Sequence, residues 1–154
     1  MSKFAKIAIG AAGGAIGALI MGQAAKATAK VVGAQPPKGE DPTEKVANAV
    51  AKKVTGHRLR EPARKSGGQV VHYAFGAAMG ALYALLAEDV PFVTAGRGAL
   101  FGAAIYAGAH ALAVPAIGLA PGPLESGAKL ESAEFSAHLA YGTVTDAVCR
   151  LFSR

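Results

Sequence analysis

The chain has 154 residues, a mean hydropathy of +0.32 and only 17 % charged residues, whereas a soluble domain carries nearer a quarter. Its 20 glycines lie largely inside apolar runs, where they favour close helix packing in lipid. The single cysteine excludes an internal disulfide, and the net charge of +6 is concentrated in one loop beside apolar segments, which fits a membrane surface better than nucleic acid. We therefore expect one all-α domain over residues 1–154, an integral membrane bundle of about four transmembrane helices rather than a soluble enzyme.

The first predicted transmembrane helix covers residues 7–25, an uncharged run long enough to cross the bilayer core of ~30 Å. Small residues recur along it every four positions: Gly10, Gly14, Ala18 and Gly22. Such a stripe favours close packing against another helix, and a glycine-lined pore is the alternative interpretation. The run and its preceding lysines also resemble a signal peptide, but we expect the segment to be retained as a helix.

Residues 26–69 form a hydrophilic connection with ten Lys or Arg residues. Within it, Asp41 as N-cap, Pro42 as first helical residue and Gly56 as stop predict a helix over residues 42–55. Val46, Val50 and Val54 follow one another at intervals of four, with lysines beside them. This pattern predicts an amphipathic helix on the lipid headgroups, or equally a solvated linker helix. The excess of Lys and Arg places this loop on the cytoplasmic side.

Three more spans are predicted, over residues 70–87, 98–119 and 133–151. The second contains His72, and the third contains His110 followed by Pro115, which predicts a kink because proline removes a backbone hydrogen bond. The fourth carries one polar stripe at intervals of four residues: Glu134, His138, Gly142 and Asp146. A helix that is polar on one side belongs in a bundle interior or at a water surface, and with three apolar partners we expect the bundle.

Three histidines are expected at similar depth in the membrane. His72 is near the start of its span, His110 lies past the midplane of its span and His138 is near the start of the last one. All three therefore fall in the half of the bilayer next to the long loop, with Glu134 one turn from His138. Ionisable groups in hydrocarbon turn inward and partner each other. His72, His110, His138 and Glu134 are therefore a candidate metal site, with a haem held between two histidines or a proton relay as further possibilities. The competing interpretation is a purely structural network of interhelical hydrogen bonds.

A structural ion pair is expected at the opposite end, where Glu88, Arg97 and Asp146 meet by the same depth argument. His57, in the basic loop, is expected to be solvated. Catalytic residues are not predicted, because the sequence lacks the nucleophile-elbow, P-loop and zinc-protease motifs.

From His72 onward the chain resembles the YagU-like family of bacterial inner-membrane proteins, a family of unknown function. The resemblance is carried by residues 72–76, by residues 110–121 with their His110…Pro115…Pro121 pattern, and by residues 132–139 around Glu134 and His138. It implies a multi-pass protein of the bacterial inner membrane, and a loose association of that family with acid tolerance would suit a proton-responsive histidine layer.

The favoured hypothesis for function is a non-enzymatic accessory or structural subunit of a larger bacterial inner-membrane complex. Its partners would be the lipid bilayer and other membrane subunits or copies of itself, and not nucleic acid. The alternative is a metal- or haem-binding or proton-responsive membrane protein that uses the histidine layer. A small pore or transporter built on the glycine stripes is the third hypothesis, and the cofactor is left unknown.

Overall fold

The computed structural model describes residues 1–35 and 39–152, and this part of the chain is helical with no β-strand. The long helices are α1 (Lys3–Val32), α2 (Pro42–Thr55), α3 (Ala63–Leu86) and α8 (Ala128–Phe152). Between α3 and α8 lie α4 (Pro91–Thr94), α5 (Ala99–Ile105), η1 (Tyr106–Ala113), α6 (Val114–Ala116) and α7 (Pro123–Ser126).

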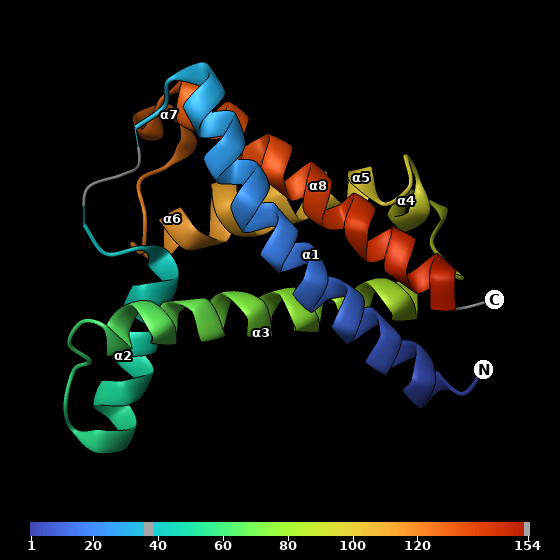
Figure 1. The fold of residues 1–154 in the computed structure, drawn as a ribbon, viewed down its shortest axis with the longest axis horizontal. Coiled ribbons are helices and arrows are strands. Elements are labelled where there is room, and N and C mark those ends of the chain that lie inside the picture. The colour runs from blue at the N-terminus through green and yellow to red at the C-terminus, as the bar shows by residue number, and fades with distance from the viewer. Residues whose placement is uncertain (36–38, 153–154) are drawn as a thin grey trace.

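The helices form an open bundle in which α1 is the central element (Figure 1). It crosses α3 and runs alongside α8, while α5 packs against α8 and α2 packs against α3. Both termini lie at one end of the bundle, and α2 and α7 lie at the other (Figure 1). Because α1, α3, α8 and the α5–α6 segment each run from one end to the other, the long loop and the termini are on opposite sides.

Glycine on both helices allows the α1–α3 crossing. A Cβ atom on Gly14 would lie 2.8 Å from the Cα of Gly80, and one on Gly80 would lie 2.6 Å from the Cα of Gly14, so neither position has room for a side chain. Gly10 and Gly76 are equally crowded by the opposite helix, whereas Gly22 meets nothing within 4 Å. At Gly10 and Gly14 the predicted stripe therefore serves close packing within this chain.

The second face of α1 and the start of α5 are also built on glycines. Gly13 and Gly17 of α1 lie against Tyr141, Thr145 and Val148 of α8. Gly98 and Gly102 face Gly142, where an added Cβ would meet backbone. Close backbone approach replaces bulky side-chain interdigitation at each of these contacts, as is usual for helices that associate in lipid.

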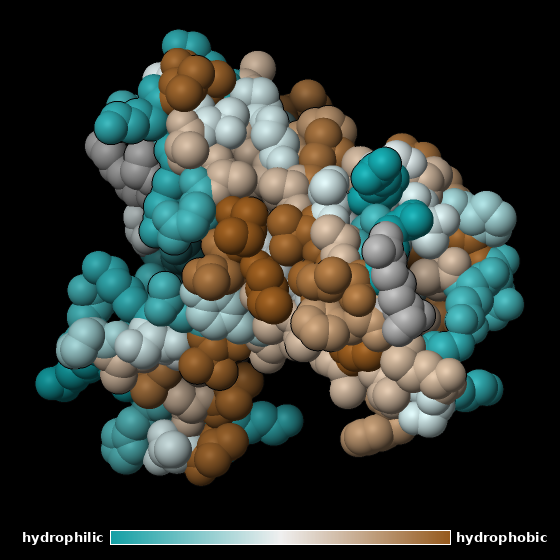
Figure 2. Space-filling model, turned by 45° about the vertical axis from the view of Figure 1, so that its right-hand side comes forward, coloured by the Kyte–Doolittle hydropathy of each residue, from teal (hydrophilic) through white to brown (hydrophobic). Residues whose placement is uncertain are grey.

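Large apolar side chains face outward on this fold. The buried apolar core consists of Ala18, Tyr83, Val93, Phe101 and Tyr141. The exposed ones include Ile16, Leu19, Ile20, Phe75, Leu82 and Leu85 on α1 and α3, and Leu112 on η1. Figure 2 shows hydrophobic residues gathered in the middle of one face, with strongly hydrophilic residues toward its left and right sides. This arrangement suits a bilayer crossed from end to end by the helices.

Three helices in the described residues are long and apolar enough to cross a membrane: Lys3–Val32, Ala63–Leu86 and Ala99–Ala116. The sequence predicted four, and this count is corrected. The fourth predicted segment lies in α8, but Glu134, Asp146 and Arg150 make it too polar to qualify. Its buried face is itself polar and consists of Ala133, Ala137, His138, Tyr141, Gly142, Thr145 and Asp146.

The distortion expected near His110 takes the form of a π-helix. From Tyr106 to Ala113 the backbone is wound with wider turns, and the Val114 amide donates to the carbonyl of Ala109, five residues earlier. The prolyl nitrogen of Pro115, the next residue, has no hydrogen to donate. Single π-helical turns of this kind are frequent at functional sites.

Candidate functional site

The centre of the candidate site is a carboxylate oxygen shared by two side chains. Tyr106 and His110, both on η1, face α8, where the Tyr106 hydroxyl donates to Oε2 of Glu131 over 2.6 Å. Nε2 of His110 lies 3.3 Å from the same Oε2 atom. The two rings stack with centroids 5.1 Å apart and an interplanar angle of 20°. The spacing of four residues places both rings on the same side of the helix.

His138 closes the site from the interior of the bundle. Its ring is 5 % exposed and meets the rings of His110 and Tyr106 with centroids 5.5 Å away in both cases. Nδ1 of His138 lies 2.7 Å from the carbonyl oxygen of Glu134, which only accepts, so Nδ1 carries the hydrogen. In the neutral ring, Nε2 is then the free acceptor. Direct contact between the two imidazoles leaves no room for a haem between them.

The predicted set of four residues is only partly brought together. His110 and His138 meet, whereas His72 turns to α1 and places Nε2 3.1 Å from the carbonyl oxygen of Ala18. Glu134 is partly buried beside this site and offers its backbone carbonyl to His138. Within residues 1–35 and 39–152, no group of three or more His, Cys, Asp or Glu side chains is arranged to hold a metal ion.

Glu131 is the functional residue that the sequence reasoning missed. The predicted fourth span begins at residue 133, so this glutamate fell into the preceding loop, although α8 begins at Ala128. Its spacing of seven residues from His138, two helical turns, was the available signal. Its side chain is 11 % exposed, which is unusual for a carboxylate without a strong partner.

At the opposite end, the acidic residues have partners other than the predicted Arg97. The Tyr83 hydroxyl donates to the buried carboxylate of Asp146, and Nε of Arg150 donates to both of its oxygens over 2.9 and 2.7 Å. Glu88 pairs with Lys6 at 2.5 Å. This contact and the Lys6 charge lower the pKa of Glu88.

Arg97 forms no ion pair in the part of the chain that the structure describes. It lies in the turn between Gly96 and Gly98 with a left-handed φ of 55° and is exposed. The expected ion pair of Arg97 with Glu88 or Asp146 is therefore corrected. Arg150 is one helical turn from Asp146, and this local partner is available without any loop having to fold over it.

These features define a class: an all-helical protein with three helices apolar enough to cross a membrane and with ionisable side chains turned inward on α8. The family described as "Protein of unknown function (DUF1440)" matches residues 28–147, and the chain belongs to this family. The match covers α2 and α3 as well as the stretch that carries the YagU-like resemblance. Comparison with curated proteins and with solved structures gave no match.

Proposed function

We propose that the chain is a non-enzymatic membrane protein whose Tyr106–His110–Glu131 site, with His138 behind it, takes up and releases a proton. The observation that carries the proposal is the 3.3 Å separation between the His110 imidazole and the Glu131 carboxylate inside a helical bundle. Imidazole is the side chain that changes charge near neutral pH. His110 lies next to the mostly buried carboxylate of Glu131. Protonated His110 forms an ion pair with this carboxylate, whereas neutral His110 leaves it as a lone anion.

The proposal requires α8 to lie within the bilayer together with the three apolar helices. Support comes from its orientation: α8 turns Thr145, Asp146 and His138 inward, while Phe135 and Leu151 are exposed. A helix with ionisable groups on its inner side and apolar groups outside is stable in lipid when those groups are satisfied. Asp146 has Tyr83 and Arg150, and Glu131 has Tyr106 and His110.

Protonation of His110 directly affects how η1 packs on α8. With His110 charged, Oε2 of Glu131 attracts both the imidazolium and the Tyr106 hydroxyl, and η1 is held against α8. With His110 neutral, the attraction between opposite charges is lost, and the tyrosine hydrogen bond and the ring contacts with His138 remain. The other charged or titratable groups around the site are Glu134 on α8, His72 on α3 and Asp41 before α2. The site therefore couples proton uptake to the position of the π-helical segment.

The test is histidine-selective NMR of the full chain in lipid nanodiscs, with signals assigned by His110→Gln and His138→Gln. We expect the ring signals of His110 and Tyr106 to change together when the pH is varied between about 5 and 8. A His110 signal that is constant over this range refutes the proposal. Metal or haem binding is the competing outcome, and elemental analysis with an absorption spectrum of the same preparation detects it.

A second candidate function, an accessory subunit of a larger membrane complex, rests on a different observation. The apolar segment Ala99–Ala116 packs mainly against α8 and is only 11 % buried. Its Gly108 has open space where a Cβ would stand. The YagU-like resemblance supports the bacterial inner membrane as its location, and the excess of Lys and Arg supports a cytoplasmic basic loop.

The subunit hypothesis is tested by cross-linking through a cysteine introduced as Gly108→Cys in a Cys149→Ser background. Adducts with other membrane proteins, or with a second copy, support it. A monomer without adducts in native membranes refutes it and leaves the protonation proposal untouched.

A further inference from the structure

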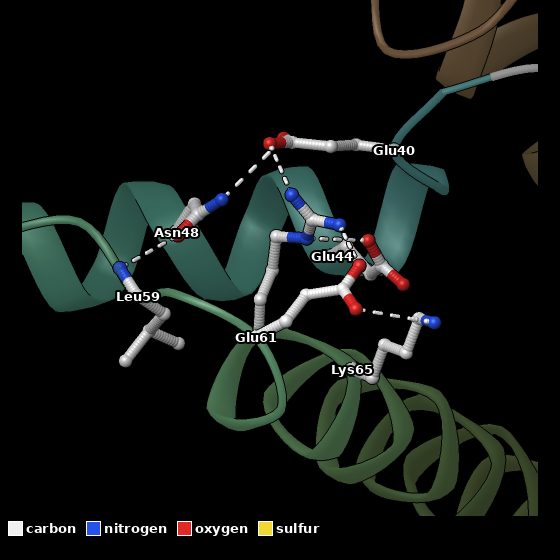
Figure 3. A network of polar contacts seen from close by, with 7 residues as sticks. Glu40, Glu44, Asn48, Leu59, Glu61 and Lys65 are labelled. Atoms are coloured by element: carbon white, nitrogen blue, oxygen red, sulfur yellow. Dashed lines mark hydrogen bonds and ion pairs between the residues drawn. The ribbon is translucent and has the colours of Figure 1, made fainter.

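Three glutamates around α2 are paired within the chain with one arginine (Figure 3). Arg64 of α3 reaches Glu40 at 3.2 Å, Glu44 at 2.9 Å and Glu61 at 2.5 Å. Glu61 also meets Lys65 at 3.3 Å. These ion pairs hold α2 against α3 and offset the negative charge of the three glutamates.

Further contacts fix the rotation of α2 about its axis. Asn48, 2 % exposed, accepts from the Leu59 amide over 2.9 Å and donates to Glu40 over 3.4 Å. Lys45 donates to the carbonyl oxygen of Leu119 over 2.6 Å, which ties α2 to the segment after α6. The face of α2 that carries Glu44, Ala47 and Asn48 is consequently turned inward.

The outward side of α2 combines apolar and basic side chains. Val50 is 56 % and Val54 is 78 % exposed, and they lie one turn apart on one flank. Four basic residues, all exposed and without an ion pair among the described residues, accompany them: Lys52, Lys53, Arg58 and Arg60. Since Glu40, Glu44 and Glu61 are already paired with Arg64 and Lys65, this surface has an excess of positive charge.

The position of α2 places this surface at the membrane boundary. The helix lies across α3 near its first residues, at the end of the bundle opposite the termini (Figure 1). If α3 crosses the bilayer, α2 lies along its surface. In Figure 2 this region, at the lower left, shows hydrophobic and strongly hydrophilic residues side by side.

We propose that α2 and the loop after it, residues 42–60, bind anionic phospholipid headgroups. Val50 and Val54 enter the boundary between headgroups and acyl chains, as in other interfacial helices, and the four basic side chains bind the phosphates. The proposal rests on the membrane crossing of α3 in the proposed function, but it is independent of the protonation site. We favour a helix on lipid headgroups over a solvated linker helix because exposed apolar and positively charged side chains occur together in this segment.

The experiment measures collisions of spin labels in the full chain, reconstituted in vesicles of phosphatidylcholine with or without phosphatidylglycerol. Labels are placed by Val54→Cys, or by Ala49→Cys about 140° away around the helix, in a Cys149→Ser background. We expect the label at 54 to favour oxygen over a water-soluble nickel complex several-fold more than the label at 49. The difference should grow with phosphatidylglycerol and be abolished by Lys52→Glu with Lys53→Glu.

Two controls make the outcomes distinct. Lys26→Glu with Lys30→Glu changes the net charge equally on α1 and should leave the label at 54 unaffected. A label at Ala78→Cys, on an exposed side of α3, reports whether α3 crosses the membrane.

The outcomes separate the two proposals. If position 78 is in acyl chains and position 54 is in water, headgroup docking is refuted and the membrane crossing of α3 stands. If position 78 is in water, the crossing fails. A label at 54 that is shielded from both reagents shows a protein partner and also refutes the proposal.

Discussion

Nε2 of His110 lies 3.3 Å from Oε2 of Glu131, across the contact between η1 and α8. Tyr106 and His110 both reach this side chain because positions four residues apart lie on the same side of a helix. Their rings overlap along the helix axis and stack with an interplanar angle of 20°.

Replacement of Glu131 by glutamine tests this relationship. The amide keeps a hydrogen-bond acceptor for Tyr106 but removes the charge that attracts the imidazolium, so we expect the pH dependence of the His110 ring signals to change. The measurement is the pH dependence of the His110 ring signals. Glu125→Gln, an exposed glutamate in α7, is the matched control and should leave the titration as it was. An identical titration in Glu131→Gln and the unmodified chain contradicts the assignment.

The glycine crossing of α1 and α3 predicts a strong contrast between two glycines. Gly80→Leu forces a side chain against the Gly14 backbone, and overpacking of this kind typically costs about 1–3 kcal/mol or more. Gly22→Leu adds the same side chain where nothing lies within 4 Å, and it should be close to neutral. Thermal unfolding in detergent, followed by a thiol-reactive dye on Cys149, compares the two. Equal unfolding temperatures would contradict the proposed role of the crossing.

The buried carboxylate of Asp146 predicts unequal effects for its two partners. Tyr83 is 1 % exposed, and Tyr83→Phe removes a buried donor to a charged group, a loss of roughly 1–3 kcal/mol. Arg150 has a side chain that is 59 % exposed, so solvent screens its ion pair and Arg150→Gln should cost less than Tyr83→Phe. Unfolding of the two variants in the same detergent measures the difference. A larger loss for Arg150→Gln would show that the ion pair, rather than the tyrosine, satisfies Asp146.

Local signals in the sequence predicted local structure well, and the orientation of side chains between helices poorly. Asp41, Pro42 and Gly56 define a helix end by their own backbone preferences, and α2 has the expected bounds of Pro42 and Thr55. The depth argument brought His110 and His138 to one end of the bundle. It carried no information on rotation about each helix axis, and the close glycine crossing of α1 and α3 directs His72 toward Ala18 instead.

The polarity of α8 shows a second limit. Its hydropathy is too low for a membrane helix by composition, because its inward face carries the charges that the site and the Tyr83–Asp146–Arg150 contact use. Mean hydropathy averages over all faces of a helix, whereas the environment of each face depends on what packs against it. For the same reason Glu131 was assigned to a loop, and Arg97 was expected to pair with acids that had closer partners.

The Lys6–Glu88 pair predicts a pH-dependent link between the start of α1 and the end of α3. The pKa of Glu88 is lowered in the folded chain, first by its hydrogen bond with Lys6 and then by the Lys6 charge. A lowered pKa means that the folded state binds this proton less readily than the unfolded state does. The stabilisation is therefore fully present above the ordinary value of 4.5 and is lost as the pH falls through the folded-state pKa.

Glu88→Gln should accordingly lower the unfolding temperature slightly at neutral pH and leave it unchanged at the acid end of the range, because the pair is exposed and screened. Lys6→Gln should reproduce this pH profile, since it removes the same interaction from the other side. Asp89→Asn, at the exposed neighbouring position, supplies the control for a lost carboxylate without a partner in the described residues. A difference between Glu88→Gln and the unmodified chain that persists into strong acid would mean that the side chain acts through packing and not through its charge.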